Sequence, residues 1–247
     1  MNWLISDLDH CLVYPKKRSS SLISGPTIDV FTRATDKSRG MEMPVKLAKL
    51  VEIISQHRVA VTARSYNDVA KLQFPFEWDY IISSHGADIF YHDKLLCNFV
   101  SESSQKAVYS TFGIIGTEKD FLTANCQDNF INSLECIYSG QYDDIPSFIE
   151  IKLHNADDFD KFAKTYSIYE LISDDLEIYR NKKVITLIPK GINKAAALAY
   201  LKESIIKQYD PDSFLIGAGD SNSDVPFLKL CDWVMAPSNS QIIMQNK

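Results

Sequence analysis

The chain has 247 residues and a formal net charge of −6 at pH 7, with 45% hydrophobic and 23% charged residues. This composition is typical of a globular protein, long enough for one large domain or for a core domain with a smaller insert. The acidic balance and the lack of a long basic run argue against a nucleic-acid partner. No stretch of the sequence approaches the roughly 18 apolar residues of a membrane span.

The cysteines and the first residues indicate the compartment. Five cysteines are scattered along the sequence without a CxxC pair, which favours reduced thiols over a disulfide framework. The apolar run Met1–Ser6 is interrupted by Asp7 and Asp9, so it is shorter than the roughly 7–15 apolar residues of a secretory signal. We expect a cytoplasmic protein, monomeric or homodimeric, with neither nucleic acid nor membrane as a partner.

The first 88 residues alternate between strand-like and helix-like segments. Pro44 opens a helix whose apolar residues recur at helical spacing as far as Ile54, and a shorter helix is expected over Tyr66–Leu72. Three short apolar runs have the character of buried strands: Trp3–Ile5, Val59–Val61 and Tyr80–Ile82. This order predicts an α/β fold with a doubly wound parallel sheet.

Between the first strand and the first helix lies Tyr14–Met43, a segment rich in Lys, Arg, Ser and Gly. Apart from Ile28–Phe31 it shows no clear periodicity. A short hairpin or flap over the first loop and a disordered surface loop are both compatible with this sequence, so the role of the segment stays open.

The middle of the chain has longer, more aromatic and more acidic segments. Strands that suit an antiparallel sheet with one covered face are expected at Phe148–Leu153, Leu176–Tyr179 and Val184–Ile188. Helices are expected at Ser103–Phe112 and Asp157–Tyr166. We interpret residues 89–188 as an α+β cap domain inserted into a core of residues 1–88 and 189–247, with hinges near Ala87–Phe90 and Pro189–Gly191.

The last part of the chain returns to the α/β pattern. Helices are expected over Gly191–Lys207 and Pro226–Leu230, and strands at Phe214–Ile216 and Trp233–Met235.

Two acidic clusters follow predicted strands. Asp7 and Asp9 come after the first strand, where an extended backbone points their side chains to the same side. Asp220 and Asp224 lie in a Gly-Asp-Ser-Asn-Ser-Asp loop after another strand. Ligands bind at the carboxyl ends of strands in open α/β sheets, and clustered carboxylates indicate a cation or raised pKa values. Mg²⁺ suits such oxygen ligands, although each cluster alone is also compatible with an ordinary polar turn.

A hydroxyl and a lysine accompany these carboxylates. Thr62 ends the second predicted strand, where it could donate a hydrogen bond to a phosphoryl oxygen or serve as an ordinary strand-end residue. Lys194 stands near the start of its helix, a position where the macrodipole does not favour a cation, so it hints at an anionic partner. Lys190 competes for this role, and a solvated lysine is the ordinary alternative for either.

These segments together resemble the haloacid dehalogenase superfamily of phosphatases. Its four motifs are matched in order by Asp7-Leu8-Asp9-His10-Cys11, by Thr62, by Lys194 and by Gly219-Asp220-Ser221-Asn222-Ser223-Asp224. The insertion after the third strand resembles the C2-type cap of the sugar-phosphatase branch, which includes sucrose-phosphate phosphatases. Thr62–Tyr66 and Ser84–Ala87 are similar to that branch too. The sequence departs from the pattern at Cys11, Ala63, His85 and Ser223, none of which removes a charge that the chemistry needs.

The resemblance implies two catalytic carboxylates. Asp7 would be the nucleophile that forms an aspartyl-phosphate, and Asp9 the acid/base that protonates the leaving group and later activates water. Mg²⁺ would be bound by Asp7, by the backbone carbonyl of Asp9 and by Asp220, with Asp224 completing the site.

The resemblance also places residues around the phosphate. Thr62 and Lys194 would stabilise the phosphoryl oxygens. Ala63 and Arg64 would lie beside the substrate, although an arginine in such a place is more often structural. The cap is expected to supply specificity.

The leading hypothesis is a Mg²⁺-dependent phosphatase that hydrolyses a small phosphorylated metabolite, with sugar phosphates as the first class to test. One alternative is a phosphotransferase or mutase, such as the similar C2-capped phosphomannomutases. A second alternative is a non-catalytic phosphate-binding module, against which the intact set of charged residues argues.

Overall fold

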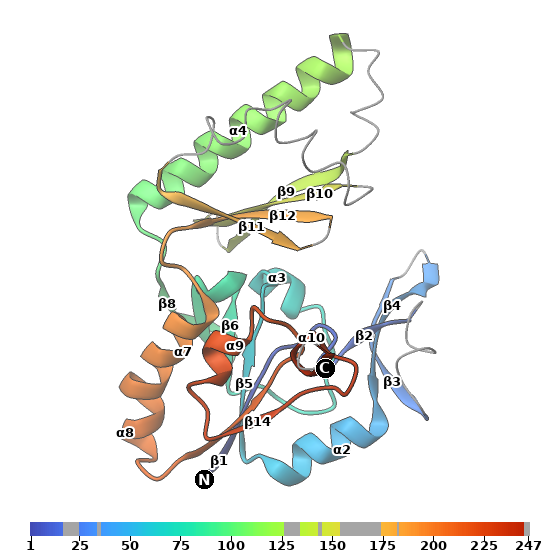
Figure 1. The fold of residues 1–247 in the computed structure, drawn as a ribbon, viewed down its shortest axis with the longest axis vertical. Helices are drawn as coiled ribbons and strands as arrows, with labels where there is room; N and C mark the ends of the chain where they lie inside the picture. The colour runs from blue at the N-terminus through green and yellow to red at the C-terminus, as the bar shows by residue number, and fades with distance from the viewer. Residues whose placement is uncertain are drawn as a thin grey trace. The chain divides into compact units, whose positions relative to one another are not determined.

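The computed structural model describes residues 1–16, 25–33, 36–125, 134–142, 145–153, 174–181 and 183–244. It divides the chain into two compact units (Figure 1). The first unit combines Met1–Asn98 with Asn193–Lys247, and the second is Phe99–Ile192. Within the described ranges, no helix combines the length with the apolar character that a bilayer span requires.

The first unit is built on a seven-stranded sheet in the order β14-β13-β1-β5-β6-β7-β8. Neighbouring strands from β14 to β6 run parallel, while β7 and β8 are antiparallel to their neighbours. The strands are β1 (Asn2–Ser6), β5 (His57–Val61), β6 (Tyr80–Ser83), β7 (Asp88–Tyr91), β8 (Lys94–Asn98), β13 (Phe214–Ala218) and β14 (Trp233–Met235).

Helices lie on both faces of this sheet, as the doubly wound pattern predicts. Trp3 and Ile5 of β1 belong to a buried cluster with Leu198 of α7 and Phe227 of α9. Leu4 points to the other face, because side chains alternate along a strand, and there it lines a cavity with residues of α2. The helical segments are α2 (Val45–Ile54), α3 (Tyr66–Val69), η1 (Ser84–Gly86), α7 (Lys194–Leu201), η4 (Lys202–Ile206), α8 (Lys207–Tyr209), α9 (Val225–Leu228) and α10 (Gln241–Met244).

The segment Tyr14–Met43, which the sequence left open, contributes strands to a small sheet. The strands β2 (Tyr14–Pro15), β3 (Thr27–Arg33) and β4 (Asp36–Pro44) pair in the order β2-β4-β3. Strands β3 and β4 form an antiparallel pair. Gly40 permits their close approach, since a Cβ atom there would clash with the carbonyl oxygen of Phe31. The described part of this segment is therefore a hairpin, the first of the two expected alternatives.

The second unit pairs one long helix with a four-stranded antiparallel sheet in the order β11-β12-β10-β9. Val108 and Ile115 of α4 belong to the same buried cluster as Ile149, Ile151 and Leu187 of the sheet. The elements are α4 (Glu102–Asn125), β9 (Leu134–Tyr142), β10 (Ile145–Leu153), β11 (Leu176–Asn181) and β12 (Val184–Pro189). The strands expected in this region are confirmed, β9 was not predicted, and the helix expected at Asp157–Tyr166 lies outside the described residues.

The structure divides the chain later than the sequence suggested, at 98/99 and 192/193 instead of 88/89 and 188/189. Strand β7 pairs with β6 and β8 pairs with β7, so both extend the large sheet. Ile89 and Phe90 are fully buried, as residues of a core strand should be. The segment Ala87–Phe90 is thus core and not a hinge. The two strands were missed because each is only four or five residues long and they are joined by a short turn, without the helix that separates the parallel strands.

Candidate active site

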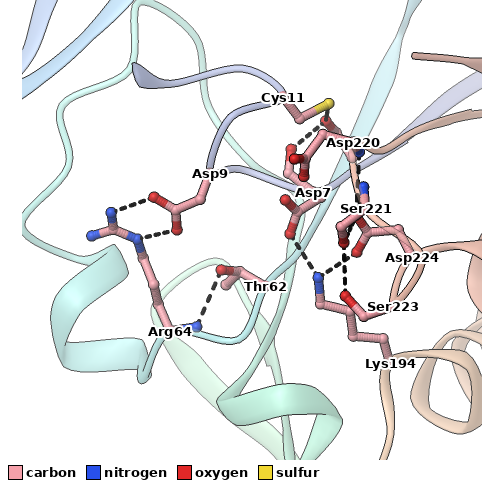
Figure 2. A network of polar contacts seen from close by, with 11 residues as sticks. Asp7, Asp9, Cys11, Thr62, Arg64, Lys194, Asp220, Ser221, Ser223 and Asp224 are labelled. Atoms are coloured by element: carbon pink, nitrogen blue, oxygen red, sulfur yellow. Dashed lines mark hydrogen bonds and ion pairs between the residues drawn. The ribbon is translucent and has the colours of Figure 1, made fainter. Parts of the chain in front are cut away.

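Three neighbouring strands of the large sheet carry the predicted site residues at their carboxyl ends. Strand β1 pairs with β13 on one side and with β5 on the other. Asp7 follows β1, and its backbone N–H donates to the carbonyl of Ala218 at 2.9 Å. The loop after β13 carries Asp220 and Asp224, and Thr62 follows β5. The sheet order therefore brings together residues that are far apart in the sequence (Figure 2).

The first feature of the site is a cluster of three carboxylates. Asp7, Asp220 and Asp224 each offer an oxygen atom, and these oxygens all lie within 4.8 Å of one another. Asp7 is 5% exposed and Asp224 is fully buried. Like charges held this close in a poorly hydrated place repel one another strongly, so the cluster requires a compensating cation or a bound proton.

Lys194 supplies one positive charge to this cluster. Its Nζ atom lies 2.7 Å from an oxygen of Asp7 and 2.7 Å from an oxygen of Asp224. Lys194 is the first residue of α7, and the Asn193 side chain caps that helix by accepting from the Ala196 N–H at 2.8 Å. Figure 2 shows the lysine between the two carboxylates. Lys190, the competing candidate, belongs to the other unit.

The charges in the cluster perturb its pKa values. Burial raises the pKa of Asp7 to about 7, against the opposing effect of Lys194. Burial, followed by the charge of Asp224, raises the pKa of Asp220 to about 6. Burial alone would also raise the pKa of Asp224, but Lys194 and Ser221 together hold it below its usual value. Burial would lower the pKa of Lys194, yet Asp7 and Asp224 raise it. One ammonium therefore does not neutralise three carboxylates.

The donor set of the cluster fits a hard divalent cation. Three carboxylates within mutual reach offer only oxygen, which Mg²⁺ prefers and usually supplements with several waters. The side chain of Asp9 is not part of this group, because it is turned toward Arg64. Asp7, Asp220 and Asp224 are thus the side chains that could hold the ion.

Asp9 forms a bidentate ion pair with Arg64. The arginine Nε and Nη2 atoms donate to the two carboxylate oxygens at 2.7 Å and 2.6 Å. The pair is partly exposed, with 39% of the Asp9 side chain and 25% of the Arg64 side chain accessible. Burial would lower the pKa of Arg64, but the hydrogen bonds to Asp9 raise it. Because a guanidinium fork matches a carboxylate in its plane, it fixes the orientation of Asp9 as well as its position.

Thr62 lies at the end of β5 and is almost completely buried. Its backbone N–H donates to the carbonyl of Ile82 at 2.8 Å, and its hydroxyl oxygen accepts from the Arg64 N–H at 3.2 Å. Because the hydroxyl is the acceptor in its bond with Arg64, its own proton can still be donated to an anion. Ala63 lies half-buried between these two residues.

The loop that carries the last two carboxylates is organised by Asp224. One of its oxygens accepts from the Asp220 N–H at 3.2 Å, the Ser221 N–H at 3.0 Å and the Ser221 hydroxyl at 2.8 Å. Gly219 allows the tight turn, since a Cβ atom there would come within 2.8 Å of the Asp224 Cβ. Asp224 thus shapes the loop with one oxygen and binds Lys194 with the other.

Two features of the site were missed in the sequence. The Asp9–Arg64 pair depends on β1 and β5 being neighbours, and the position of Arg64 two residues after a strand-end threonine was the available signal. The second feature is the contact of η1 with the loop after β5, although Ser84–Ala87 itself was noted in the sequence: Ser84 N–H donates to the Arg64 carbonyl at 2.7 Å and His85 N–H to the Thr62 carbonyl at 3.2 Å. Gly86 lies directly against the Asn193 backbone.

Cys11 is buried close to the carboxylate cluster. The residue is 4% exposed, and its sulfur is 3.8 Å from the Ser6 hydroxyl. Burial and the charge of Asp7 raise the pKa of its thiol, which therefore stays protonated. A protonated thiol is a poor nucleophile, which favours a packing role for Cys11.

Solved structures share this architecture at low sequence identity. A trehalose-6-phosphate phosphatase related protein is 18% identical with a TM-score of 0.56, and the alignment covers 95% of this chain and 84% of that one. A protein from Thermotoga maritima is 12% identical, with a TM-score of 0.58 and coverage of 98% and 89%. The C-terminal domain of C. albicans trehalose-6-phosphate phosphatase is 14% identical, with a TM-score of 0.51 and coverage of 92% and 73%. Identities this low establish the shared fold alone.

No curated protein matches the sequence significantly. Residues 47–246 match the family described as haloacid dehalogenase-like hydrolase. Thr62, Lys194, Asp220 and Asp224 lie inside the matched range, and Asp7 and Asp9 precede it. The match confirms the resemblance to the haloacid dehalogenase superfamily that the four motifs indicated. It also agrees with the capped Rossmann-like fold that this resemblance implied. The chain belongs to the haloacid dehalogenase-like hydrolase family.

Proposed function

We propose that this hydrolase is a Mg²⁺-dependent phosphatase that cleaves a small phosphorylated metabolite through an aspartyl-phosphate on Asp7. The observation that carries the proposal is the position of Lys194, at 2.7 Å from both Asp7 and Asp224 in a cluster of three carboxylates. A nucleophile, an ammonium and a set of oxygen ligands in one place are what phosphoryl transfer requires, because it depends mainly on positioning and charge neutralisation.

In the first step, an oxygen of Asp7 attacks phosphorus and the bond to the leaving oxygen breaks. Asp9 donates its proton to that oxygen, so the alcohol leaves neutral. Lys194 and the Thr62 hydroxyl donate to the phosphoryl oxygens, where negative charge has to be stabilised. Bound Mg²⁺, held by Asp7, Asp220 and Asp224, would supply further positive charge at this place.

In the second step, Asp9 removes a proton from water, and the resulting oxygen attacks phosphorus of the aspartyl-phosphate. The bond from phosphorus to Asp7 breaks, which releases inorganic phosphate and regenerates both carboxyl groups. Arg64 donates to both oxygens of Asp9 and so holds this side chain in place, and one of these two hydrogen bonds opens when Asp9 carries the proton. Ala63, between Thr62 and Arg64, lines the phosphate side of the site.

We take sugar phosphates as the leading substrate class and place the enzyme in the cytoplasm. One solved structure with this fold is named as a domain of a trehalose-6-phosphate phosphatase and another as a trehalose-6-phosphate phosphatase related protein, which supports the choice without fixing the sugar. The inserted unit, Phe99–Ile192, is the proposed cap domain.

Phosphate release by the purified protein tests the proposal. The full chain is incubated with p-nitrophenyl phosphate and with a panel of sugar phosphates, with Mg²⁺ or with EDTA. We expect Mg²⁺-dependent release that Asp7→Asn abolishes, with Lys49→Gln on the exposed side of α2 as the control. Release that is unaffected by EDTA would remove the metal from the proposal. Sugar isomerisation without net phosphate release would favour the phosphotransferase alternative.

A further inference from the structure

The hairpin of β3 and β4 forms one side of an open cavity that has no part in the reaction steps proposed above. The cavity has a volume of about 410 Å³ and lies between this hairpin and α3. Its walls include Phe31, Met41, Arg64, Asp68, Lys71 and Leu72. A volume of this size falls at the lower end of the range for small-molecule sites, roughly 300–1,000 Å³.

Arg64 connects this cavity to the catalytic carboxylates. The same side chain that lines the cavity donates two hydrogen bonds to Asp9. In the proposed reaction Asp9 protonates the leaving oxygen, so the rest of the leaving group must begin beside Asp9. The Arg64 side chain therefore links the cavity to Asp9, beside which the leaving oxygen of the substrate must lie.

The walls of the cavity are held in place on both sides. The backbone N–H of Gln73, just after α3, donates to the Val30 carbonyl of β3 at 2.7 Å. Asp68 is fixed by Ser65, which caps α3 by accepting from the Asp68 N–H at 3.3 Å and donates its own hydroxyl to the Asp68 carboxylate at 3.1 Å. A site with fixed walls binds its ligand without the loss of conformational entropy that the ordering of a loop would cause.

Each charged side chain in the walls has a partner of opposite charge. Lys71 lies 2.7 Å from Asp68, and Arg64 is paired with Asp9. Such a site does not attract a second phosphate or a carboxylate. It does offer a carboxylate acceptor and an ammonium donor to hydroxyl groups, beside apolar side chains such as Phe31 that can pack against the C–H face of a ring.

We propose that this cavity binds the leaving group of the substrate, and that this group is neutral and polyhydroxylated, of the size of a sugar. The inference rests on the proposed phosphatase activity and extends it. It assigns part of the substrate specificity to the β3–β4 hairpin and α3, with Phe31 as the packing surface and Asp68 and Lys71 as the hydroxyl partners.

The kinetic test compares substrates with and without a sugar in wild-type protein, Phe31→Ala and Lys71→Gln. The substrates are glucose 6-phosphate, mannose 6-phosphate and trehalose 6-phosphate, with acetyl phosphate as the reference that has no sugar. For the best sugar phosphate, we expect its kcat/KM relative to that of acetyl phosphate to fall about tenfold in each variant. Lys49→Gln should leave the ratio unchanged, and circular dichroism checks that each variant is folded.

A ratio that stays at the wild-type value in both folded variants would overturn the inference while leaving the phosphatase proposal intact. A second result would also overturn it: wild-type protein prefers fructose 1,6-bisphosphate to fructose 6-phosphate, and Lys71→Gln removes this preference. The site would then be selecting an anion.

A binding measurement separates this inference from the proposed activity. Saturation-transfer NMR with free glucose, mannose and trehalose reports binding to the Mg²⁺-loaded protein without turnover. If no substrate releases phosphate but one sugar binds to wild-type protein and loses its signal in Phe31→Ala and Lys71→Gln, the sugar site stands and the phosphatase proposal fails. If neither turnover nor sugar binding is seen, both are wrong.

Discussion

At the scale of single residues, the site is organised by two cation–carboxylate contacts with different geometry. Lys194 is a point charge shared by Asp7 and Asp224, and it is almost completely buried. Arg64 is a planar fork on the two oxygens of Asp9 and is partly open to solvent. The first contact balances charge, whereas the second sets orientation. Substitution of the two cations should therefore have different consequences.

Removal of the Lys194 charge should destabilise the protein as well as inactivate it. Lys194→Gln leaves two buried carboxylates without their partner, which costs about 3–5 kcal/mol in the free energy of unfolding without Mg²⁺. Chemical denaturation measures this loss, and Lys49→Gln should change the same quantity by less than about 0.5 kcal/mol. A Lys194→Gln variant as stable as wild type would mean that the lysine does not neutralise the cluster.

Removal of the Arg64 fork should act mainly on catalysis. Arg64→Lys keeps a positive charge but cannot hold both oxygens of Asp9, so we expect kcat/KM to fall by about tenfold to a hundredfold. Arg64→Gln, which also lacks the charge, should lose at least as much. Steady-state kinetics with one substrate compares the two variants. An Arg64→Lys variant with wild-type kcat/KM would show that charge alone suffices.

At the scale of elements, the sequence predicted most of the parallel sheet. Its strands are continuous apolar runs, such as Trp3–Ile5 and Val59–Val61. The position of the site could be predicted from the ends of these runs, because ligands bind at the carboxyl ends of parallel strands. The pairing of Asp9 with Arg64 could not be predicted, since it depends on which strands are neighbours. The structure of the charged hairpin around Phe31 was ambiguous for a different reason, because its sequence shows little apolar periodicity.

The turn η1 should be sensitive to a single added methyl group. Gly86 has a φ of +107°, and a Cβ atom there would clash with the Asn193 carbonyl at the start of α7. Gly86→Ala should therefore lower the free energy of unfolding by about 2–4 kcal/mol and displace Lys194, with loss of activity. Thermal denaturation together with a phosphatase assay measures both effects.

Gly191→Ala is the matched control for this substitution. Gly191 also has a positive φ, of +82°, but in the part of the chain that the structure describes, its two neighbours in sequence aside, no atom lies within 4 Å of the position that a Cβ atom would take. The cost should be only the backbone strain, about 1 kcal/mol. Equal losses for the two variants would show that contact between η1 and α7 is unimportant.

At the scale of the whole molecule, the carboxylate cluster makes stability depend on pH and on Mg²⁺ together. Asp7 and Asp220 have pKa values of about 7 and about 6, above the usual 3.8. Between roughly pH 4 and 7 the folded protein thus binds more protons than the unfolded chain, and its metal-free stability should fall as the pH rises. Mg²⁺ requires the deprotonated carboxylates, so its stabilising effect should grow over the same range.

Thermal melts with and without Mg²⁺ measure this coupling. The increase in Tm that a few millimolar Mg²⁺ produces should be larger at about pH 7.5 than at about pH 5. Asp220→Asn, which removes one of the two raised pKa values and one metal ligand, should be more stable than wild type without Mg²⁺ at neutral pH and gain less from the ion. An Mg²⁺ effect that is the same at both pH values would contradict the proposed ligands.

The most direct test of the account is detection of the phosphoryl group on Asp7. The protein is mixed with Mg²⁺ and a ³²P-labelled sugar phosphate that it turns over, quenched in acid after milliseconds to seconds, and the labelled peptide is identified by mass spectrometry. We predict a label on Asp7 that forms and decays as phosphate is released, and that is missing in Asp7→Asn and in the presence of EDTA. Phosphate release without any label on Asp7, or a label that persists in Asp7→Asn, would contradict the mechanism.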